Sequence, residues 1–325
     1  MNPGPYIPIT PVRNEEQFLQ GAIDSMARQV LRPQEWIIVD DGSTDRTGEI
    51  ALAAAGVYPW ITVIRRPDRG YRKAGGGVIE AFYDGYRAIK QGGWQFVAKL
   101  DGDLSFEPDY FERCLARFEK DPTLGIGGGA ICAQVAGCLL AEAPGDPAFH
   151  VRGATKIYKR DCWEAIGGLM QAPGWDTVDE FKANMLGWAT YTFKDIKVCH
   201  HRHAGGAYGA WNNWVKNGLA NYVAGYHPLF MLVKCLRRAV RQRSLTAAAG
   251  LGCGYLKGCL RRAPRAEARV VRYVQRQQLN QLLLKPSLWS GAGPAPCASS
   301  ARGLNGKNTD LPTPPQRKVD PVRDR

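Results

Sequence analysis

The sequence predicts an α/β protein with a mostly parallel central sheet, flanking helices and a basic helical segment toward its C-terminal end. Apolar runs alternate with helical stretches, acidic clusters follow two of these runs, and positive charge gathers late in the chain. The 325 residues are 45% hydrophobic and 22% charged, as in ordinary globular proteins. This composition argues against a disordered or collagen-like chain.

The first hundred residues predict four strands separated by helices. Pro33 ends the first helix, and the run Glu35–Val39 is apolar throughout, as expected of a parallel strand buried on both faces. A basic, glycine-rich loop at 69–77 precedes the third helix. In chain order the predicted elements are strand 6–11, a helix from Asn14, strand 35–39, a helix after the turn 40–45, strand 61–64, a helix through Ile79 and Phe82, and strand 96–100.

The rest of the chain is less regular. It predicts a strand at 154–158, helices at 160–166 and 178–186, a strand at 190–194 and a helix at 211–222. Two or three basic amphipathic helices follow within 229–284. We therefore expect a first domain at 1–236, divided at about residue 103 into two halves. A basic helical segment at 237–288 and a disordered, Pro/Gly-rich tail at 289–325 complete the predicted organisation.

The net charge of +13 belongs to one segment. Residues 1–233 carry 24 basic and 26 acidic side chains, whereas residues 234–276 carry 12 basic and one acidic. The front of the chain is thus slightly acidic, and we expect no nucleic-acid partner. The segment interleaves basic with apolar residues, which predicts docking on an anionic membrane surface. The alternative is a solvated helix face packed on the catalytic domain.

Cysteines and the N-terminal sequence indicate the compartment. Nine cysteines lack CxxC spacing, and no signal-peptide pattern precedes the first strand. No apolar run of about eighteen residues predicts a membrane span. We expect reduced cysteines and a cytoplasmic protein, peripheral at the inner face of the cell membrane.

Two acidic clusters end predicted strands, where ligands of such sheets bind. Asp101-Gly102-Asp103 places two carboxylates one residue apart, which suits a divalent metal bridging a diphosphate, although a solvated acidic turn is the alternative. An EF-hand is excluded because Phe106 stands where its loop needs glycine. Asp40-Asp41 can accept from a base N–H or a ribose hydroxyl, or can cap a helix.

These clusters belong to a larger resemblance. The segments 9–16 (ITPVRNEE), 39–45 (VDDGSTD), 100–103 (LDGD), 166–169 (IGGL) and 177–180 (TVDE) occur in the order and spacing of family-two glycosyltransferases, over roughly residues 5–235. The chain therefore resembles this family, which implies the GT-A fold and inverting transfer from a nucleotide sugar. The resemblance also implies that 1–236 is the catalytic domain, with a nucleotide half at about 1–103 and an acceptor half at about 104–236. Such transfer needs a base for the incoming hydroxyl and stabilisation of the departing diphosphate.

The resemblance also implies roles for single residues. The nucleotide would contact Pro11, Arg13, Glu15, Asp41 and, by adjacency, Asp40. Asp101 would lie near the ribose or a metal-bound water, and Asp103 would ligate Mn²⁺ or Mg²⁺, with His200, or alternatively His201, completing the metal shell. Asp179 matches the catalytic base, with Glu180 as the alternative because the family's Glu-Asp order is inverted here.

Other features of the chain indicate the class of acceptor and the number of sugars transferred. Arg72 and Lys73 in the glycine-rich loop are candidate diphosphate contacts, or else solvated. Four tryptophans would stack on sugar or pack in the core: Trp175, Trp188, Trp211 and Trp214. The presence of a base favours a hydroxyl acceptor, on a glycan or lipid-linked glycan. The chain lacks the Gln-x-x-Arg-Trp pattern of processive synthases in this family, which favours transfer of one sugar. We expect a UDP-sugar donor by default and a role in cell-surface or exopolysaccharide synthesis. The alternatives are a polyprenyl-phosphate glycosyltransferase and a sugar nucleotidyltransferase.

Overall fold

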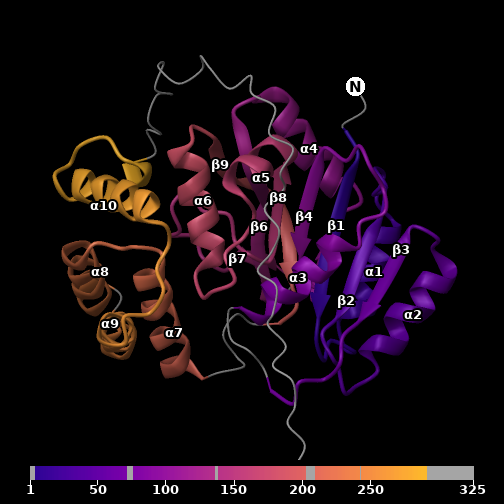
Figure 1. Cartoon of the computed structure of the whole chain (residues 1–325), viewed down its shortest axis with the longest axis horizontal. Helices are drawn as coiled ribbons and strands as arrows, with labels where there is room; N and C mark the ends of the chain where they lie inside the picture. Colours follow the sequence, from indigo (N-terminus) through magenta and orange to yellow (C-terminus); the bar gives the residue numbers. More distant parts are fainter. Residues whose placement is uncertain (1–3, 72–75, 136–137, 203–208, 242, 291–325) are drawn as a thin grey trace, which may run out of the picture. The chain divides into compact units, whose positions relative to one another are not determined.

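The four predicted parallel strands form one half of the sheet. The computed structural model describes residues 4–71, 76–135, 138–202, 209–241 and 243–290. Strands β1 (Tyr6–Val12), β2 (Trp36–Asp40), β3 (Ile61–Arg65) and β4 (Phe96–Leu100) lie in the order β3-β2-β1-β4, and every neighbouring pair is parallel. Their carboxyl ends therefore meet at one edge, where both acidic clusters lie (Figure 1).

Helices cover both faces of this half because its strands are apolar on both sides. Ile7 and Ile9 of β1 face one core, whereas Tyr6 and Val12 face the other. Helices α1 (Leu19–Ala27), α2 (Thr47–Val57) and α4 (Tyr110–Lys120) supply the core on the Tyr6 side. The opposite core is supplied by α3 (Gly77–Arg87), α5 (Arg160–Ile166) and α6 (Trp175–Met185).

The second half of the sheet mixes parallel and antiparallel pairs. It consists of β5 (Leu104–Phe106), β6 (Leu124–Val135), β7 (Cys138–Ala141), β8 (Thr155–Lys159) and β9 (Ala189–His200). Within the described residues, nine strands form one sheet in the order β3-β2-β1-β4-β8-β6-β9-β5, with β7 beside β6. β8 runs antiparallel to β4 and β6, and β9 runs parallel to β6.

Strand β6 was not predicted because its glycines have little intrinsic preference for strands. The structure gives the reason for glycine: a Cβ on Gly128 would lie 2.3 Å from the carbonyl oxygen of Thr155. β9 is longer than the predicted strand 190–194 and continues to His200. This extension carries the predicted metal ligand to the edge of the sheet where β5 begins.

Four helices follow the sheet and share a third core. They are α7 (Ala210–Val223), α8 (Pro228–Arg241), α9 (Leu245–Leu260) and α10 (Ala268–Leu282), followed by the short η1 (Leu288–Ser290). Figure 1 shows them gathered beside α6, which adds Val178 and Phe181 to the same core. Among the described residues, no helix has both the length and the apolarity needed to cross a bilayer.

The basic segment contains three helices, α8, α9 and α10, at the upper end of the expected number. Chain contacts group Met1–Pro294 into one compact unit that includes these helices. The predicted boundaries at 236 and 288 stay predictions. The predicted tail lies, from residue 291 onward, outside the described residues.

Candidate functional site

The turn after β2 carries a buried carboxylate held by arginines. Asp41 contacts Arg66 through one carboxylate oxygen and Arg69 through the other. The backbone oxygen of Asp41 accepts a hydrogen bond of 2.5 Å from Arg13, which also pairs with Asp68 at 2.6 Å. Burial raises the pKa of Asp41, and the nearby arginines oppose that shift. The cluster places three guanidinium groups around one strand end, where a diphosphate would meet positive charge.

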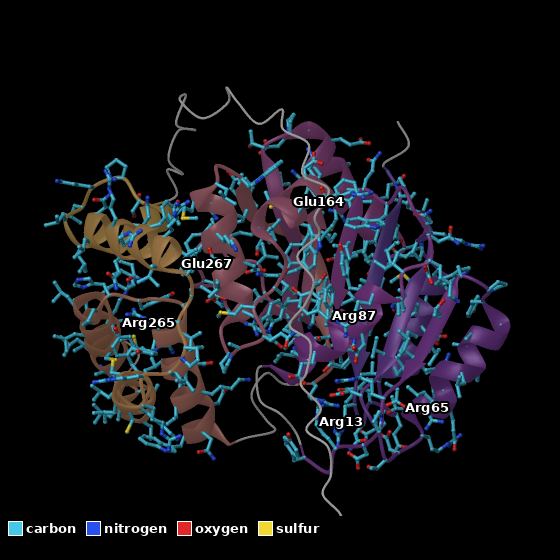
Figure 2. All side chains as sticks on the ribbon, viewed as in Figure 1. Arg13, Arg65, Arg87, Glu164, Arg265 and Glu267 are labelled. Carbon is cyan, nitrogen blue, oxygen red and sulfur yellow. The ribbon has the colours of Figure 1, made fainter. Side chains whose placement is uncertain are left out.

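Asp40, next to Asp41 in the chain, has its side chain buried and bonded within the turn after β2. Its side chain is 1% exposed, and its Oδ1 accepts a hydrogen bond of 2.8 Å from the backbone N–H of Ser43. Arg65 at the end of β3 lies 3.6 Å from its Oδ2. Figure 2 labels Arg13 and Arg65 at the same edge of the sheet, where β1 and β3 end. Asp40 therefore stabilises the turn that presents Asp41.

The DxD segment follows β4 directly. Asp101 contacts the ammonium of Lys99, and burial raises its pKa against the attraction of that lysine. Asp103 Oδ2 lies 3.4 Å from His200 Nε2. Burial raises the pKa of Asp103, but the hydrogen bond and charge of His200 outweigh it, so its pKa lies below the ordinary value. The structure thus brings together the predicted ligands Asp103 and His200.

The Asp103 site passes a simple test for a metal. Asp103 Oδ1 is buried and has no hydrogen-bond partner within the described residues. A buried carboxylate oxygen without a donor is costly unless something else binds it, and a divalent cation is such a group. No set of three protein ligands is assembled among the described residues. This agrees with Mg²⁺-type sites that use one or two protein ligands and take their remaining oxygens from substrate phosphates.

Sequence reasoning missed two residues that hold this site together. Glu142 Oε1 lies 2.7 Å from His200 Nδ1 and orients the imidazole. Burial lowers the pKa of His200, but Asp103 and Glu142 raise it more, to about 9. Arg202 joins Glu15, at 2.5 Å, to Asp103, at 3.8 Å. Glu142 comes directly after β7 and gave no sequence signal, whereas Arg202 stood within the histidine-rich run itself.

Two of the remaining candidates are placed away from these contacts, and two are not described. His201 Nε2 lies 2.8 Å from Ser105 Oγ, and its ring stacks on Phe18 rather than facing Asp103. Pro11 lies within β1, opposite Val39 of β2. Arg72 and Lys73 lie outside the described residues.

Asp179 and Glu180 lie inside the protein in a buried charge cluster. Lys156 Nζ is 2.9 Å from both oxygens of Asp179 and 2.7 Å from Glu180 Oε1, and all three side chains are fully buried. Tyr158 donates a 2.6 Å hydrogen bond to Asp179, and His150 Nδ1 lies 2.9 Å from Glu180. Burial raises the pKa of Asp179 to about 6, against the attraction of Lys156. These contacts stabilise α6 against β8.

Asp176, one turn earlier on α6, has a different environment. It is half-buried and lines a cavity of about 190 Å³ between α6, α7 and α8. Gly174, with φ of +84°, starts α6 and places Asp176 in its first turn. The preceding residue, Trp175, has both Lys99 and Lys156 at 5.7 Å from its ring, so it joins the DxD side to α6. The sequence signal that could have identified Asp176 is its position two residues after Gly174, the glycine at which α6 starts.

Comparisons with known proteins link this chain to glycosyltransferases. The family model described as Glycosyl transferase family 2 matches residues 9–137. Chondroitin synthase of Pasteurella multocida is 32% identical over 114 residues, 35% of this chain and 11% of that protein. Undecaprenyl-phosphate 4-deoxy-4-formamido-L-arabinose transferase of Edwardsiella ictaluri is 26% identical over 207 residues, 60% of this chain and 52% of that protein. The match therefore spans about a tenth to about half of the length of these curated relatives.

A solved structure supports the fold. Mannosyltransferase PcManGT of Pyrobaculum calidifontis, in complex with GDP-Man and Mn²⁺, has a TM-score of 0.52 at 17% identity. The likeness covers 89% of this chain and 83% of that one. It confirms the expected GT-A architecture, including the sheet and its flanking helices.

Proposed function

Because this chain is a member of glycosyl transferase family 2 with the GT-A fold, we propose that it transfers one sugar, with inversion, from a nucleotide sugar to a hydroxyl group of a glycan or lipid-linked glycan. UDP-sugars are the default donors. A role in cell-surface or exopolysaccharide synthesis accords with the names of its relatives.

The observation that carries this proposal is the partnerless oxygen of Asp103 beside His200. Asp103 and His200 would hold Mn²⁺ or Mg²⁺, with Asp101 near the ribose or a metal-bound water. A divalent cation there would neutralise charge on the departing nucleoside diphosphate. Glu142 keeps the His200 ring in place, and Arg202 fixes the end of β1 against Asp103.

Arginines and Asp41 would bind the donor nucleotide. Asp41 is at the end of β2 and can accept from base or ribose donors, while Arg13, Arg66 and Arg69 stand around it. Their positive charge favours a diphosphate at the same edge. Arg72 and Lys73 remain proposed contacts of the diphosphate.

We propose Asp176 as the base that deprotonates the acceptor hydroxyl. A base must reach the substrate, and Asp176 lines a cavity, whereas Asp179 and Glu180 are fully buried and paired with Lys156. The role predicted for Asp179, with Glu180 as alternative, stays a prediction. The variant Asp176→Asn should bind donor as the wild type does and lose transfer by 10²-fold or more, the scale of general-base catalysis.

Donor binding provides the test of the proposed function. Thermal shift with UDP, GDP and their sugars is measured with and without Mn²⁺ for the wild type, Asp103→Asn and the exposed control Asp195→Asn. We expect one nucleotide class to stabilise the wild type and Asp195→Asn only with the metal, and Asp103→Asn not at all. Equal metal-dependent stabilisation of Asp103→Asn would refute the metal role.

A polyprenyl-phosphate acceptor is the second candidate, favoured by the Edwardsiella relative that matches 60% of this chain. A phosphate acceptor is already an anion and needs no base. In that case Asp176→Asn would retain most of its transferase activity with an undecaprenyl phosphate acceptor. The same variant therefore separates the two reactions.

The membrane expectation rests on exposed apolar side chains among the basic helices. On α8, Leu232, Leu236 and Val240 are 56%, 56% and 74% exposed. We propose that this face binds an anionic membrane surface, at the inner leaflet, and anchors the enzyme peripherally. Changing these three residues to Gln should weaken binding to anionic vesicles, while Leu52→Gln, an exposed position on α2, should not; equal binding of both variants would contradict the proposal.

A further inference from the structure

The cavity beside Asp176 has features that the proposed reaction alone does not require. It lies between α6, α7 and α8 and has a volume of about 190 Å³, large enough for a phosphate group with surrounding water. Its wall includes two cations from successive turns of α8, Lys234 and Arg238, together with the carboxamides Asn217 and Asn221 of α7. Side chains that can donate hydrogen bonds therefore line this cavity beside Asp176.

The two cations of α8 are held in place by the cavity wall. Lys234 Nζ donates to Asn221 Oδ1 at 3.3 Å and lies 4.8 Å from the centre of the Tyr226 ring. The guanidinium of Arg238 lies 4.3 Å from the ring of Trp214. These contacts with an amide oxygen and with aromatic rings position the two side chains at the cavity. Paired cations of this kind are the usual protein groups for binding oxyanions.

The pKa values of Lys234 and Arg238 also favour an anion in this cavity. Burial, and then the charge of Arg238, lowers the pKa of Lys234 to about 8, although exposed Asp146 opposes the shift. Burial also lowers the pKa of Arg238. An anion between the two side chains would offset both effects by direct attraction.

We propose that this cavity binds a phosphate group carried by the acceptor substrate. The inference rests on the proposed function, because Asp176 on the opposite wall would act on a hydroxyl of that same acceptor. Lys234 and Arg238 are then binding residues that fix the acceptor, and they take no part in the chemistry at the anomeric carbon.

The surface of α8 suggests how the phosphate could be presented. Leu229, Leu232, Leu236 and Val240 of this helix are exposed, whereas Lys234 and Arg238 line the cavity. A phosphate ester with an apolar chain would contact both sets of side chains, while a soluble phosphorylated glycan would use the cavity alone. Both carry the same recognised group.

Titration of the full chain tests the proposal. Inorganic pyrophosphate is titrated calorimetrically in EDTA, because the proposed donor site needs a divalent metal and should not bind its ligand once the metal is removed. The variants are Lys234→Met, the charge-retaining Lys234→Arg, and Arg237→Met as a matched control on the exposed side of α8. Melting temperatures verify that each variant folds.

We expect Lys234→Met to bind pyrophosphate at least tenfold more weakly than the wild type, and Lys234→Arg and Arg237→Met to bind within about threefold. Equal affinity of Lys234→Met and the wild type would overturn the proposal. Nucleotide binding in the Mn²⁺ assay should be unchanged in Lys234→Met, so loss of the donor function and loss of this cavity are separate results.

A vesicle arm identifies the source of the phosphate. Flotation is compared on phosphatidylcholine vesicles with and without phosphatidic acid. Extra binding to phosphatidic acid that Lys234→Met loses and Arg237→Met keeps would support a lipid phosphate. Pyrophosphate binding that depends on Lys234, with no such difference on vesicles, would support a soluble phosphorylated acceptor.

Discussion

Replacing Lys156 by Met should destabilise the protein strongly. Lys156 Nζ is the charge that compensates both Asp179 and Glu180, at 2.9 and 2.7 Å, in a cluster without solvent exposure. Met retains the apolar stem and removes the ammonium, so the two buried carboxylates lose this charge and Glu180 keeps the neighbouring imidazole of His150. Removing one partner of a buried ion pair lowers the free energy of unfolding by about 3–5 kcal/mol.

This loss translates into a measurable shift. Domains somewhat smaller than this one lose about 2–4 °C of melting temperature per kcal/mol, so Lys156→Met should melt roughly 6–20 °C below the wild type. The assay is calorimetric or spectroscopic melting at pH 7.5, with Lys194→Met as control because Lys194 is exposed on β9. The control should change by less than about 0.5 kcal/mol.

The same experiment bears on the base. Were Asp179 a solvent-accessible base, the loss of Lys156 would alter activity while leaving stability nearly intact. A melting temperature of Lys156→Met within about 2 °C of the wild type would refute the buried-cluster reasoning. In that case Asp179 would again be the stronger candidate for the catalytic base.

Three further changes test other parts of the structure. Burial lowers the pKa of His150, but the charge and hydrogen bond of Glu180 outweigh it, so this pKa is raised above 6.5. The stability that protonated His150 contributes is therefore complete below pH 6.5 and is lost as the pH rises through the pKa of His150 in the folded protein. The melting-temperature gap between the wild type and His150→Gln should therefore shrink from pH 6 to 9, and a constant gap would contradict this. Gly254→Ala should cost about 1–3 kcal/mol on melting, because its Cβ would lie 2.0 Å from the Val215 oxygen, whereas Gly252→Ala, with its nearest contact at 4.0 Å, should be neutral or stabilising. Asp41→Asn should weaken nucleotide binding about tenfold or more in calorimetric titration, by losing a charged hydrogen-bond acceptor, and unchanged affinity would exclude Asp41 as a donor contact.

Local sequence patterns predicted much of the first half of the sheet. Apolar runs bounded by turn residues identified strands β1 to β4 within one or two residues, because a strand buried on both faces leaves an uninterrupted signal. The ends of parallel strands meet at one edge whatever the details of packing, so Asp41 and Asp103 could be assigned to one edge from the chain alone. Strand β6 could not be predicted, since glycine at position 128 is required by the close backbone of β8 and not by local preference.

By itself the sequence determined the fold class and the acidic motifs that follow β2 and β4, because these depend on short segments with their own periodicity and spacing. The tertiary structure decided which carboxylates are accessible. Asp176 and Asp179 are three residues apart on one helix, yet one lines a cavity and the other is buried against Lys156, a residue of another strand. It also brought Glu142 to His200 and Lys234 beside the cavity that Asp176 lines. Burial and charge pairing arise from elements far apart in the chain, so only their packing could assign these residues.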